Sequence, residues 1–229
     1  MFRYAVLVVI GLVAGNARAQ PASPPAEPKA PPAQASNAVV SMEEPQPGDH
    51  WTHEVRDEIT GKISDTRENV ITEVTPKNIS MRFKIVGTSN EGFNVYDRSW
   101  NLVSTAQWRY SPNQGSTGIQ APLEVGKGWS FQSNNTNSSN GAIWKETGTS
   151  KVVGQETVTT KAGTFDTFRI ETSFTIQNTK DVTKKNEVVL QTWYAPAIDH
   201  WVKRTVVSKV DKHLRRNETV ELIDYGRKQ

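Results

Sequence analysis

Hydrophobic and polar residues alternate along most of the chain from Gly48 onward. Trp51, His53 and Val55 fall on one face of an extended segment, and their neighbours are polar. The same alternation recurs at Ile79, Met81, Phe83 and Ile85. A period of two residues is typical of a β-strand with one buried face. Such one-sided strands are typical of antiparallel sheets, so the pattern predicts an antiparallel sheet.

The alternation continues to the end of the chain. It predicts further strands at residues 92–97, 105–110, 128–132, 142–146, 151–160, 165–176, 187–194, 201–210 and 218–225. Residues 188–190 are apolar on both faces, which predicts either a central strand or a strand that is covered on both faces. Residues 133–141 are rich in Asn and Ser and are predicted to form a loop. No window shows a helical period. We therefore predict a mainly β fold with few or no long helices, either a curved antiparallel sheet or an incomplete β-barrel.

Residues 1–19 have the three-part layout of a secretory signal peptide. Arg3 precedes an apolar run at residues 5–14, and Ala17-Arg18-Ala19 follows it. This layout predicts cleavage between Ala19 and Gln20 and a periplasmic or secreted protein. The alternative is an uncleaved anchor, but the run is half of the roughly 20 apolar residues that a span requires. We therefore predict no transmembrane span in the mature protein.

Residues 20–47 differ sharply in composition from the rest of the chain. They hold eight of the twelve prolines. Proline fixes φ and removes a backbone donor, so this segment is predicted to be a disordered, extended tether. It is either a spacer that lifts the domain from a surface or partner, or a leader without a partner. Residues 48–227 are predicted to form a single all-β domain.

Composition excludes several kinds of chemistry. The chain has no cysteine, which excludes disulfides, thiol catalysis, thiolate metal sites and a lipid anchor on an N-terminal cysteine. It has 27 Lys and Arg against 24 Asp and Glu. Cleavage would remove Arg3 and Arg18 and leave 25 against 24, so we predict no nucleic-acid partner. Neither a P-loop nor a dinucleotide-binding glycine motif occurs, and we predict no cofactor.

Histidine offers one candidate metal site. The tripeptide Asp-His-Trp occurs at Asp49–Trp51 and again at Asp199–Trp201. One interpretation is that both Asp-His pairs meet at the rim of the sheet and hold a divalent metal. The other is that each Trp fills the core while its Asp forms a turn. We favour the second interpretation and predict no metal site.

The sequence offers equally little evidence for catalytic groups. No G-x-S-x-G nucleophile elbow or S-x-x-K box occurs, and no serine has a histidine partner that the sequence singles out. A carboxylate pair of the glycosidase type is defined by spatial separation, so a hydrolase stays open as a third interpretation. We predict a protein that is not an enzyme and has no catalytic residues.

Seven tryptophans are many for a domain of this size. Indole rings can form a ligand surface, or they can seal the ends of a curved sheet. Trp51 stands among apolar residues and is predicted to lie in the core. Trp108 and Trp144 have polar neighbours and are predicted to be exposed, functional rings. We take Trp108, Trp144, Trp201 and His200 as candidate ligand-binding residues.

Three segments carry a resemblance to a known bacterial pattern: Ala121–Trp129, Lys161–Ile170 and Trp193–Pro196. Together they resemble the exported TapB-like domain family, over roughly residues 120–205. That family is similar in fold to the lipoprotein carriers of the LolA/LolB group, which cup acyl chains in an open β half-barrel. The resemblance implies this fold and this type of ligand, and it provides no active site. Residues 197–201 depart from the family pattern, which has glycines there.

The sequence thus predicts an exported, non-catalytic envelope protein. Its curved sheet would bind a hydrophobic or amphiphilic ligand that resembles a lipid. The alternative is a structural or protein-interaction module with a filled sheet and an envelope protein as its partner. An open apolar cavity of a few hundred Å³ would favour the first alternative, and a filled interior would favour the second.

Overall fold

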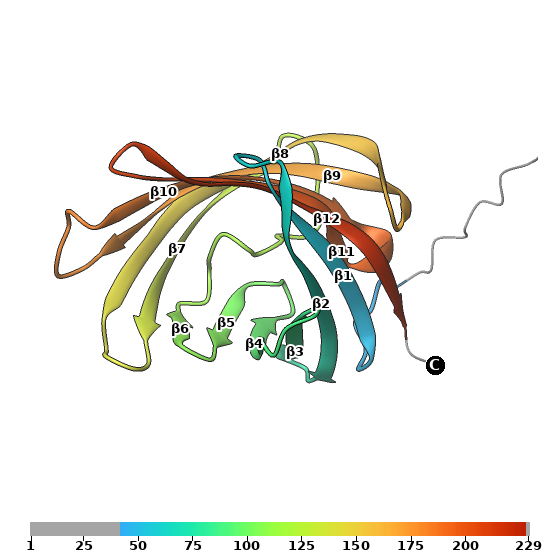
Figure 1. Ribbon diagram of the computed structural model, residues 1–229, viewed down its shortest axis with the longest axis horizontal. Coiled ribbons are helices and arrows are strands. Elements are labelled where there is room, and N and C mark those ends of the chain that lie inside the picture. The colour runs from blue at the N-terminus through green and yellow to red at the C-terminus, as the bar shows by residue number, and fades with distance from the viewer. Residues whose placement is uncertain (1–41, 228–229) are drawn as a thin grey trace, which may run out of the picture. The chain divides into compact units, whose positions relative to one another are not determined.

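Twelve antiparallel strands form a closed barrel in the computed structural model, which describes residues 42–227 (Figure 1). Strands that follow one another in the chain pair with one another, and the last strand pairs with the first. The strands are β1 (Asp49–Asp57), β2 (Lys62–Val74), β3 (Asn78–Ile85), β4 (Glu91–Asp97), β5 (Leu102–Thr105), β6 (Trp108–Ser111), β7 (Gly128–Asn137), β8 (Ile143–Thr160), β9 (Gly163–Asn178), β10 (Lys185–Ala195), β11 (His200–Val210) and β12 (His213–Arg227), with one 3-10 turn, η1 (Pro196–Ile198), between β10 and β11. The prediction of a mainly β fold without long helices is confirmed.

Closure of the barrel corrects the prediction of an incomplete one. β1 pairs with β12 over its whole length, from Asp49 opposite Arg227 to Asp57 opposite Glu218. The Arg227 guanidinium donates to both carboxylate oxygens of the buried Asp49, over 2.8 and 3.0 Å, and so fastens the seam at one end. Closure satisfies the donors and acceptors that an open sheet would leave on its edges. Side-chain alternation is the same in open and closed sheets, so it could not distinguish them.

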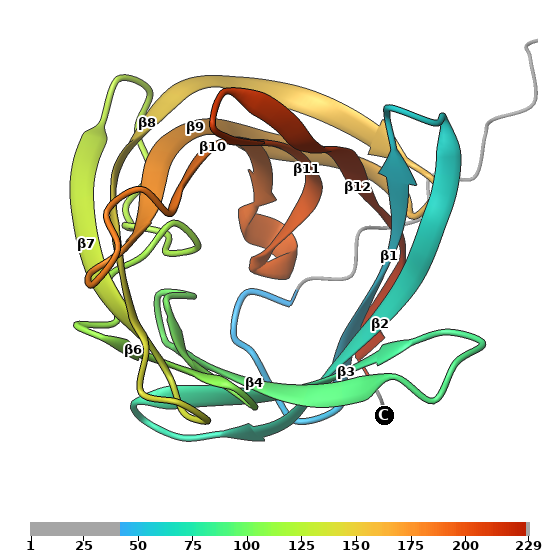
Figure 2. The same ribbon diagram turned by 60° about the vertical axis from the view of Figure 1, so that its left-hand side comes forward.

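The two ends of the barrel differ. Because neighbouring strands are antiparallel, alternate connections lie at opposite ends. One end, which we call the mouth, carries the short connections at residues 58–61, 86–90, 106–107, 138–142, 179–184 and 211–212. The other end, which we call the plugged end, carries residues 42–48, 75–77, 98–101, 112–127, 161–162 and 196–199. Viewed nearly along the barrel, residues 42–48 and η1 lie within the ring of strands (Figure 2).

A hydrophobic cluster fills the plugged end. It includes Met42, Trp51, Trp100 and Ile198, all buried. The backbone N–H of Met42 donates to the carbonyl of Ala197 over 2.7 Å, which joins the N-terminal segment to η1. Residues 42–47 were predicted to belong to the tether, but here they are part of the domain, because Met42 supplies apolar volume that the barrel end requires. The rest of the predicted tether, and the predicted signal peptide, lie outside the described residues.

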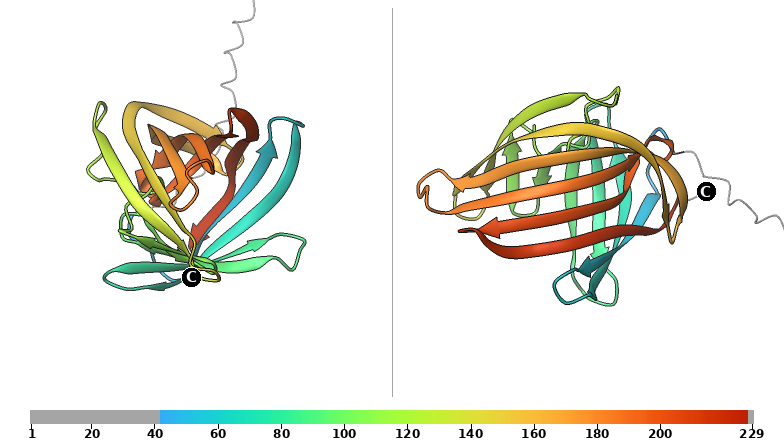
Figure 3. Two further views of the ribbon diagram at one scale, coloured as in Figure 1. Left: turned by 90° about the vertical axis from the view of Figure 1, so that its left-hand side faces the viewer. Right: turned by 90° about the horizontal axis from the view of Figure 1, so that it is seen from above.

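The hairpin of β8 and β9 covers part of the outer surface. Strands β8 to β12 lie side by side (Figure 3), and β8 and β9 are the longest, with 18 and 16 residues. Near the tip of this hairpin, Phe165 is buried and its ring contacts Tyr225 of β12, with 5.4 Å between centroids. Lys161 at the tip forms an ion pair of 2.9 Å with Glu54 of β1. The tip of the hairpin therefore packs onto the plugged end, and Phe165 belongs to the hydrophobic cluster there.

The structure corrects one local prediction and decides between the two alternatives of another. The Asn- and Ser-rich segment 133–141 was predicted as a loop, but β7 continues through Asn137. Ser133 and Asn135 of this segment are buried inside the barrel, where Asn135 donates to Glu146 over 3.0 Å. Of the two alternatives for residues 188–190, a strand covered on both faces is wrong, because 49% of Val189 is exposed on the outer surface; β10 is instead a central strand between β9 and β11.

No helix within residues 42–227 is long and apolar enough to cross a membrane.

Candidate ligand-binding cavity

The barrel encloses a cavity of about 940 Å³. Inward-facing side chains of most strands line it, and more of its surface is apolar than polar. A closed barrel of this many strands is wider than one whose interior side chains can fill completely, which accounts for the space. The volume lies within the range of about 300–1,000 Å³ that is usual for small-molecule sites.

An apolar section of the lining lies between Arg204 and the mouth, where polar residues such as Asn186, Ser208 and Arg216 follow. Alternate residues of β9, β10 and β11 point inward there, because the period of a strand is two. These apolar lining residues are Phe174 and Ile176 of β9, Val188 and Leu190 of β10, and Val206 of β11. Phe83 and Ile85 of β3 continue the apolar lining. The arrangement offers a hydrophobic surface that is suited to alkyl or aromatic groups.

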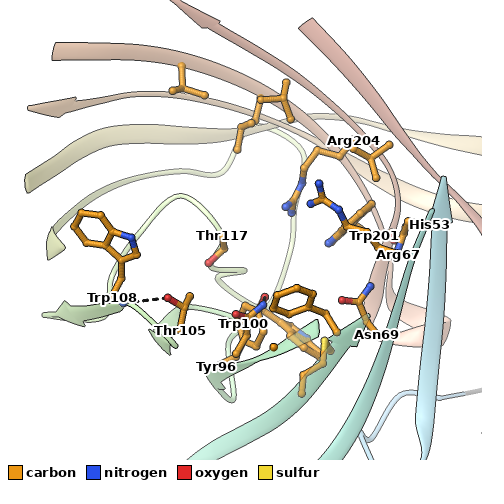
Figure 4. Close-up of a pocket in the computed structure, with 18 of the residues that line it drawn as sticks. His53, Arg67, Asn69, Tyr96, Trp100, Thr105, Trp108, Thr117, Trp201 and Arg204 are labelled. Atoms are coloured by element: carbon orange, nitrogen blue, oxygen red, sulfur yellow. Dashed lines mark hydrogen bonds between the residues drawn. The ribbon is translucent and has the colours of Figure 1, made fainter. Parts of the chain in front are cut away.

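Polar groups gather deeper in the cavity. Asn69 donates to the carbonyl of Trp51 over 3.3 Å, and Asn94 donates to the hydroxyl of Tyr96 over 3.4 Å. Burial raises the pKa of Tyr96, so its hydroxyl keeps its proton. Figure 4 shows Asn69 and Tyr96 together with Arg67 and Arg204, which reach into the cavity. A few convergent polar groups in an apolar pocket are typical of sites that orient a ligand.

Arg204 is the arginine of this cavity that has no carboxylate partner among the described residues. Its Nε donates to the Thr192 hydroxyl over 3.1 Å. Its guanidinium lies over the ring of Trp201, 4.7 Å from the centroid. Burial lowers the pKa of Arg204 to about 10, so the group is still charged at pH 7. Arg67, by contrast, makes a two-pronged ion pair with Asp65, over 2.9 and 3.1 Å.

Two histidines belong to an aromatic cluster at the inner side of the plugged end. The ring of His200 lies 4.5 Å from that of Trp51 and 5.2 Å from that of Trp100, centroid to centroid. The ring of His53 stacks on Trp201 at 3.8 Å. One ring nitrogen of each histidine lies within hydrogen-bond distance of the Trp201 carbonyl, at 3.3 and 3.2 Å. These rings form the floor of the cavity.

The electrostatic state of the floor follows from burial. Desolvation disfavours the imidazolium ion and lowers the pKa of His53 well below its ordinary value. The same cause lowers the pKa of His200 to about 3. Both rings are therefore neutral at pH 7, and the floor carries no charge of its own. In this state the rings act as packing groups and hydrogen-bond partners.

One carboxyl group near the floor has the opposite shift. Asp199 follows η1 and is half-buried. Burial raises its pKa to about 6, although the Tyr194 hydroxyl donates to its Oδ1 and favours the ionised form. Asp199 also has a left-handed backbone, with φ of 44°.

Asp199 should make the folded state less stable as the pH rises. Its pKa is higher in the folded than in the unfolded chain, so its contribution is fully present below about pH 4 and is lost as the pH rises through about 6. The loss should be about 2 kcal/mol after an allowance for partial exposure. Asp199→Asn, which tolerates the same φ, should remove this term from unfolding free energies measured in urea between pH 4 and pH 7.

Asp211→Asn is the matched control. Asp211 also has a positive φ, of 51°, but its side chain is exposed. Replacement there makes the same Asp-to-Asn change at a positive φ without removing a buried carboxyl group, so it gives the baseline for the substitution itself. An Asp199→Asn variant with the wild-type pH dependence would contradict the assignment.

The predicted ligand-binding residues separate in the structure. Trp201 and His200 line the cavity at its floor, and Trp108 lines it on the opposite side from Arg204 (Figure 4). Trp144 is half-buried on β8 and does not line the cavity. Ligand binding by these residues stays a prediction. The sequence reasoning missed Arg204. Its neighbours in the chain are polar, as they often are for an arginine that faces the solvent.

The Asp-His pairs that suggested a metal site do not converge. Asp49 is engaged with Arg227, and His50 lies 3.4 Å from Asp224 on β12. His200 faces the aromatic floor. Among residues 42–227, no group of three or more His, Asp or Glu side chains is arranged to hold a metal ion. Trp51 fills the core, as the second interpretation of this tripeptide required.

Fold and cavity together define a closed antiparallel β-barrel with one plugged end and an internal, mainly apolar pocket. Residues 112–212 match the DUF3108-like family. This range overlaps the segment that carried the resemblance to the TapB-like family, but the resemblance to TapB-like and LolA/LolB proteins itself stays a prediction. No curated protein matches the chain.

One solved structure shares the fold, and two further solved structures are less similar. A candidate lipoprotein from Parabacteroides distasonis has a TM-score of 0.50 and 12% identity, over 82% of this chain and 99% of that one. A candidate exported protein with a YmcC-like fold from Bacteroides fragilis has a TM-score of 0.49 and 14% identity, over 83% and 100%. The hypothetical lipoprotein YmcC from Escherichia coli has a TM-score of 0.43 and 10% identity, over 76% and 84%.

Proposed function

We propose that this protein is an exported, non-catalytic binding protein that holds a hydrophobic or amphiphilic ligand, such as a lipid, inside its barrel. The observation that carries the proposal is the cavity of about 940 Å³ with its apolar lining. Contact between water and an apolar lining of this size is unfavourable. An apolar ligand that covers the lining removes this contact and lowers the free energy. The structure thus favours a container over a filled scaffold.

The signal-like residues 1–19 support export to the envelope. The candidate lipoprotein that shares the fold is in keeping with such a location. A protein-interaction module with an envelope partner is the second candidate, but the empty volume inside the barrel gives it no support. A hydrolase would require His200 or a carboxylate pair beside a substrate. His200 instead packs between tryptophan rings with its Nδ1 near a backbone carbonyl.

A blocked cavity should lose its ligand. Leu190 is buried and lines the cavity, so a Leu190→Trp substitution places a larger ring in the path of the ligand. We expect the variant to bind the neutral fluorescent probe N-phenyl-1-naphthylamine about tenfold more weakly than the wild type, because overpacking and binding compete for one volume. Fluorescence titration measures the affinity, and circular dichroism verifies the β fold.

Val189→Trp is the matched control. Val189 adjoins Leu190 on the same strand but faces outward, so a tryptophan there leaves the cavity open. Its probe affinity should equal that of the wild type. Equal affinities for the Leu190→Trp and Val189→Trp variants would overturn the proposal, as would a wild-type protein that does not bind the probe.

A further inference from the structure

We infer that the cavity selects amphiphiles with an anionic head, a carboxylate or a phosphate, and that Arg204 binds this head. The inference rests on the proposed function, since it specifies the ligand class of the same cavity. Three features support it: the missing carboxylate partner of Arg204, the N–H groups that it leaves free, and its depth in the barrel behind an apolar section of the lining.

The first feature is the uncompensated charge. Three arginines line the cavity, Arg67, Arg204 and Arg216. Asp65 pairs with Arg67, and Glu218 pairs with Arg216. Among the described residues, Arg204 forms no ion pair with a carboxylate, and its contacts are Thr192 and Trp201. Arg204 is half-buried, and a charge that is withdrawn from bulk water without a partner is costly. The cost is recovered when an anionic ligand enters.

The second feature is the set of donors that Arg204 leaves open. A guanidinium has five N–H groups, and within residues 42–227 only the Nε group of Arg204 is engaged, by Thr192. The two terminal nitrogens retain their N–H groups, in the planar arrangement that matches a carboxylate or a phosphate. The stack on Trp201 holds the plane of the guanidinium in place. This arrangement is preorganised for an oxyanion.

The neighbours of Arg204 favour the same ligand. Tyr96 lies near enough for the charge of Arg204 to oppose the effect of burial on the pKa of its phenol. Its protonated hydroxyl is a donor of the kind that an oxyanion accepts. Both floor histidines are neutral, so they neither attract nor repel the head. Glu91 is the acidic residue that lines the cavity, and it lies at the mouth end of β4.

The third feature is the depth of Arg204 in the barrel. Arg204 lies opposite Thr192 in the middle of the sheet, and Leu190, Val188 and Val206 follow on the side of the mouth. Val210, at the mouth end of β11, is the sixth residue after Arg204, which corresponds to about 20 Å along the strand. For strands tilted as in other barrels, the depth is about 15 Å. An amphiphile that enters head first thus places its chain along the apolar section.

Displacement of N-phenyl-1-naphthylamine provides the test, with three competitors of one chain length: dodecanoate, dodecyl phosphate and the neutral 1-dodecanol. The wild type should bind at least one of the two anions about tenfold or more tightly than the alcohol, the gain expected for hydrogen bonds to a charged group. The stronger of the two anions identifies the head as carboxylate or phosphate. Arg204→Met should bind the anions no better than the alcohol, while its affinity for the alcohol is retained.

Two further variants keep the test decisive. Lys203→Met removes the adjacent cation, which lies over Trp193 outside the cavity lining, and it should retain the preference for anions. Arg204→Lys keeps the charge and should retain part of the preference. The Arg204→Met variant should fold, because Met replaces a cation that has no carboxylate partner. Binding of the neutral probe by this variant verifies that it has folded. Equal wild-type affinities for anions and alcohol, or a preference that survives Arg204→Met, would overturn the inference. A wild type that binds neither probe nor competitor would instead overturn the proposed function.

Discussion

Acidification from pH 7 to pH 4 should destabilise the barrel by about 3 kcal/mol through His200 alone. The pKa of His200 is about 3 in the folded protein, against about 6.5 in an unfolded chain. Below pH 6.5 the unfolded chain binds a proton that the folded protein does not bind. The stability that depends on the neutral ring is therefore full above pH 6.5 and falls as the pH drops toward 3. His53, with its lowered pKa, acts in the same direction.

His200→Phe isolates the contribution of this ring. Phenylalanine retains a flat ring between Trp51 and Trp100 but cannot titrate. Between pH 7 and pH 4, the free energy of unfolding measured in urea should fall by about 3 kcal/mol less in this variant than in the wild type. His213→Gln, at an exposed position, gives the baseline for removing a histidine that does not pack in the core. If His200→Phe and wild type lost the same stability on acidification, His200 would have to be protonated in the folded state. The effect of Asp199 on the pH dependence of stability has the opposite sign to that of the histidines. Each single variant is therefore compared with the wild type and not with another variant.

Trp51→Ala should destabilise the protein by about 3–5 kcal/mol, the usual cost of truncating a buried large aromatic side chain. Trp51 is fully buried, and it contacts Trp100 edge-on at 6.0 Å and His200 at 4.5 Å. Its removal leaves a hole where residues of β1, the 98–101 connection and β11 meet. Urea unfolding at pH 7, followed by tryptophan fluorescence or circular dichroism, measures the loss.

Trp108→Ala provides the comparison for Trp51→Ala. Trp108 lies on the short strand β6, is half-buried, and faces the cavity rather than the plugged end. Its truncation should cost less than half as much stability as that of Trp51, and it should weaken probe binding because a lining ring is lost. A larger loss of stability at Trp108 than at Trp51 would show that the plugged end does not hold the barrel together.

The sequence predicted the strands because their signal is local. Alternation at Trp51, His53 and Val55 marks the inner face of β1 correctly, and all three side chains are buried. The same rule failed where the inner face is polar: Ser133 and Asn135 are buried inside the barrel but read as loop residues. Closure also escaped the sequence, because it depends on the pairing of Asp49 with Arg227, which are 178 residues apart. No local pattern encodes such a pairing.

The candidate site was predictable only in part. Trp108, Trp201 and His200 were chosen from the sequence, and all three line the cavity. Arg204 was not chosen, because an arginine on a strand is usually a solvated residue and its lack of a partner is visible only in three dimensions. Met42 was assigned to the tether because prolines flank it in the sequence on both sides. Its burial depends on η1, which is more than 150 residues away in the chain.

The central claim is that the barrel holds a ligand in its cavity. Native mass spectrometry of the mature protein, purified without detergent and without denaturation, tests it most directly. We expect a fraction of the molecules to carry the added mass of an amphiphile, which organic extraction releases and which is absent from the Leu190→Trp variant. A wild-type protein that shows only its bare mass, and that takes up neither N-phenyl-1-naphthylamine nor dodecanoate, would contradict the account.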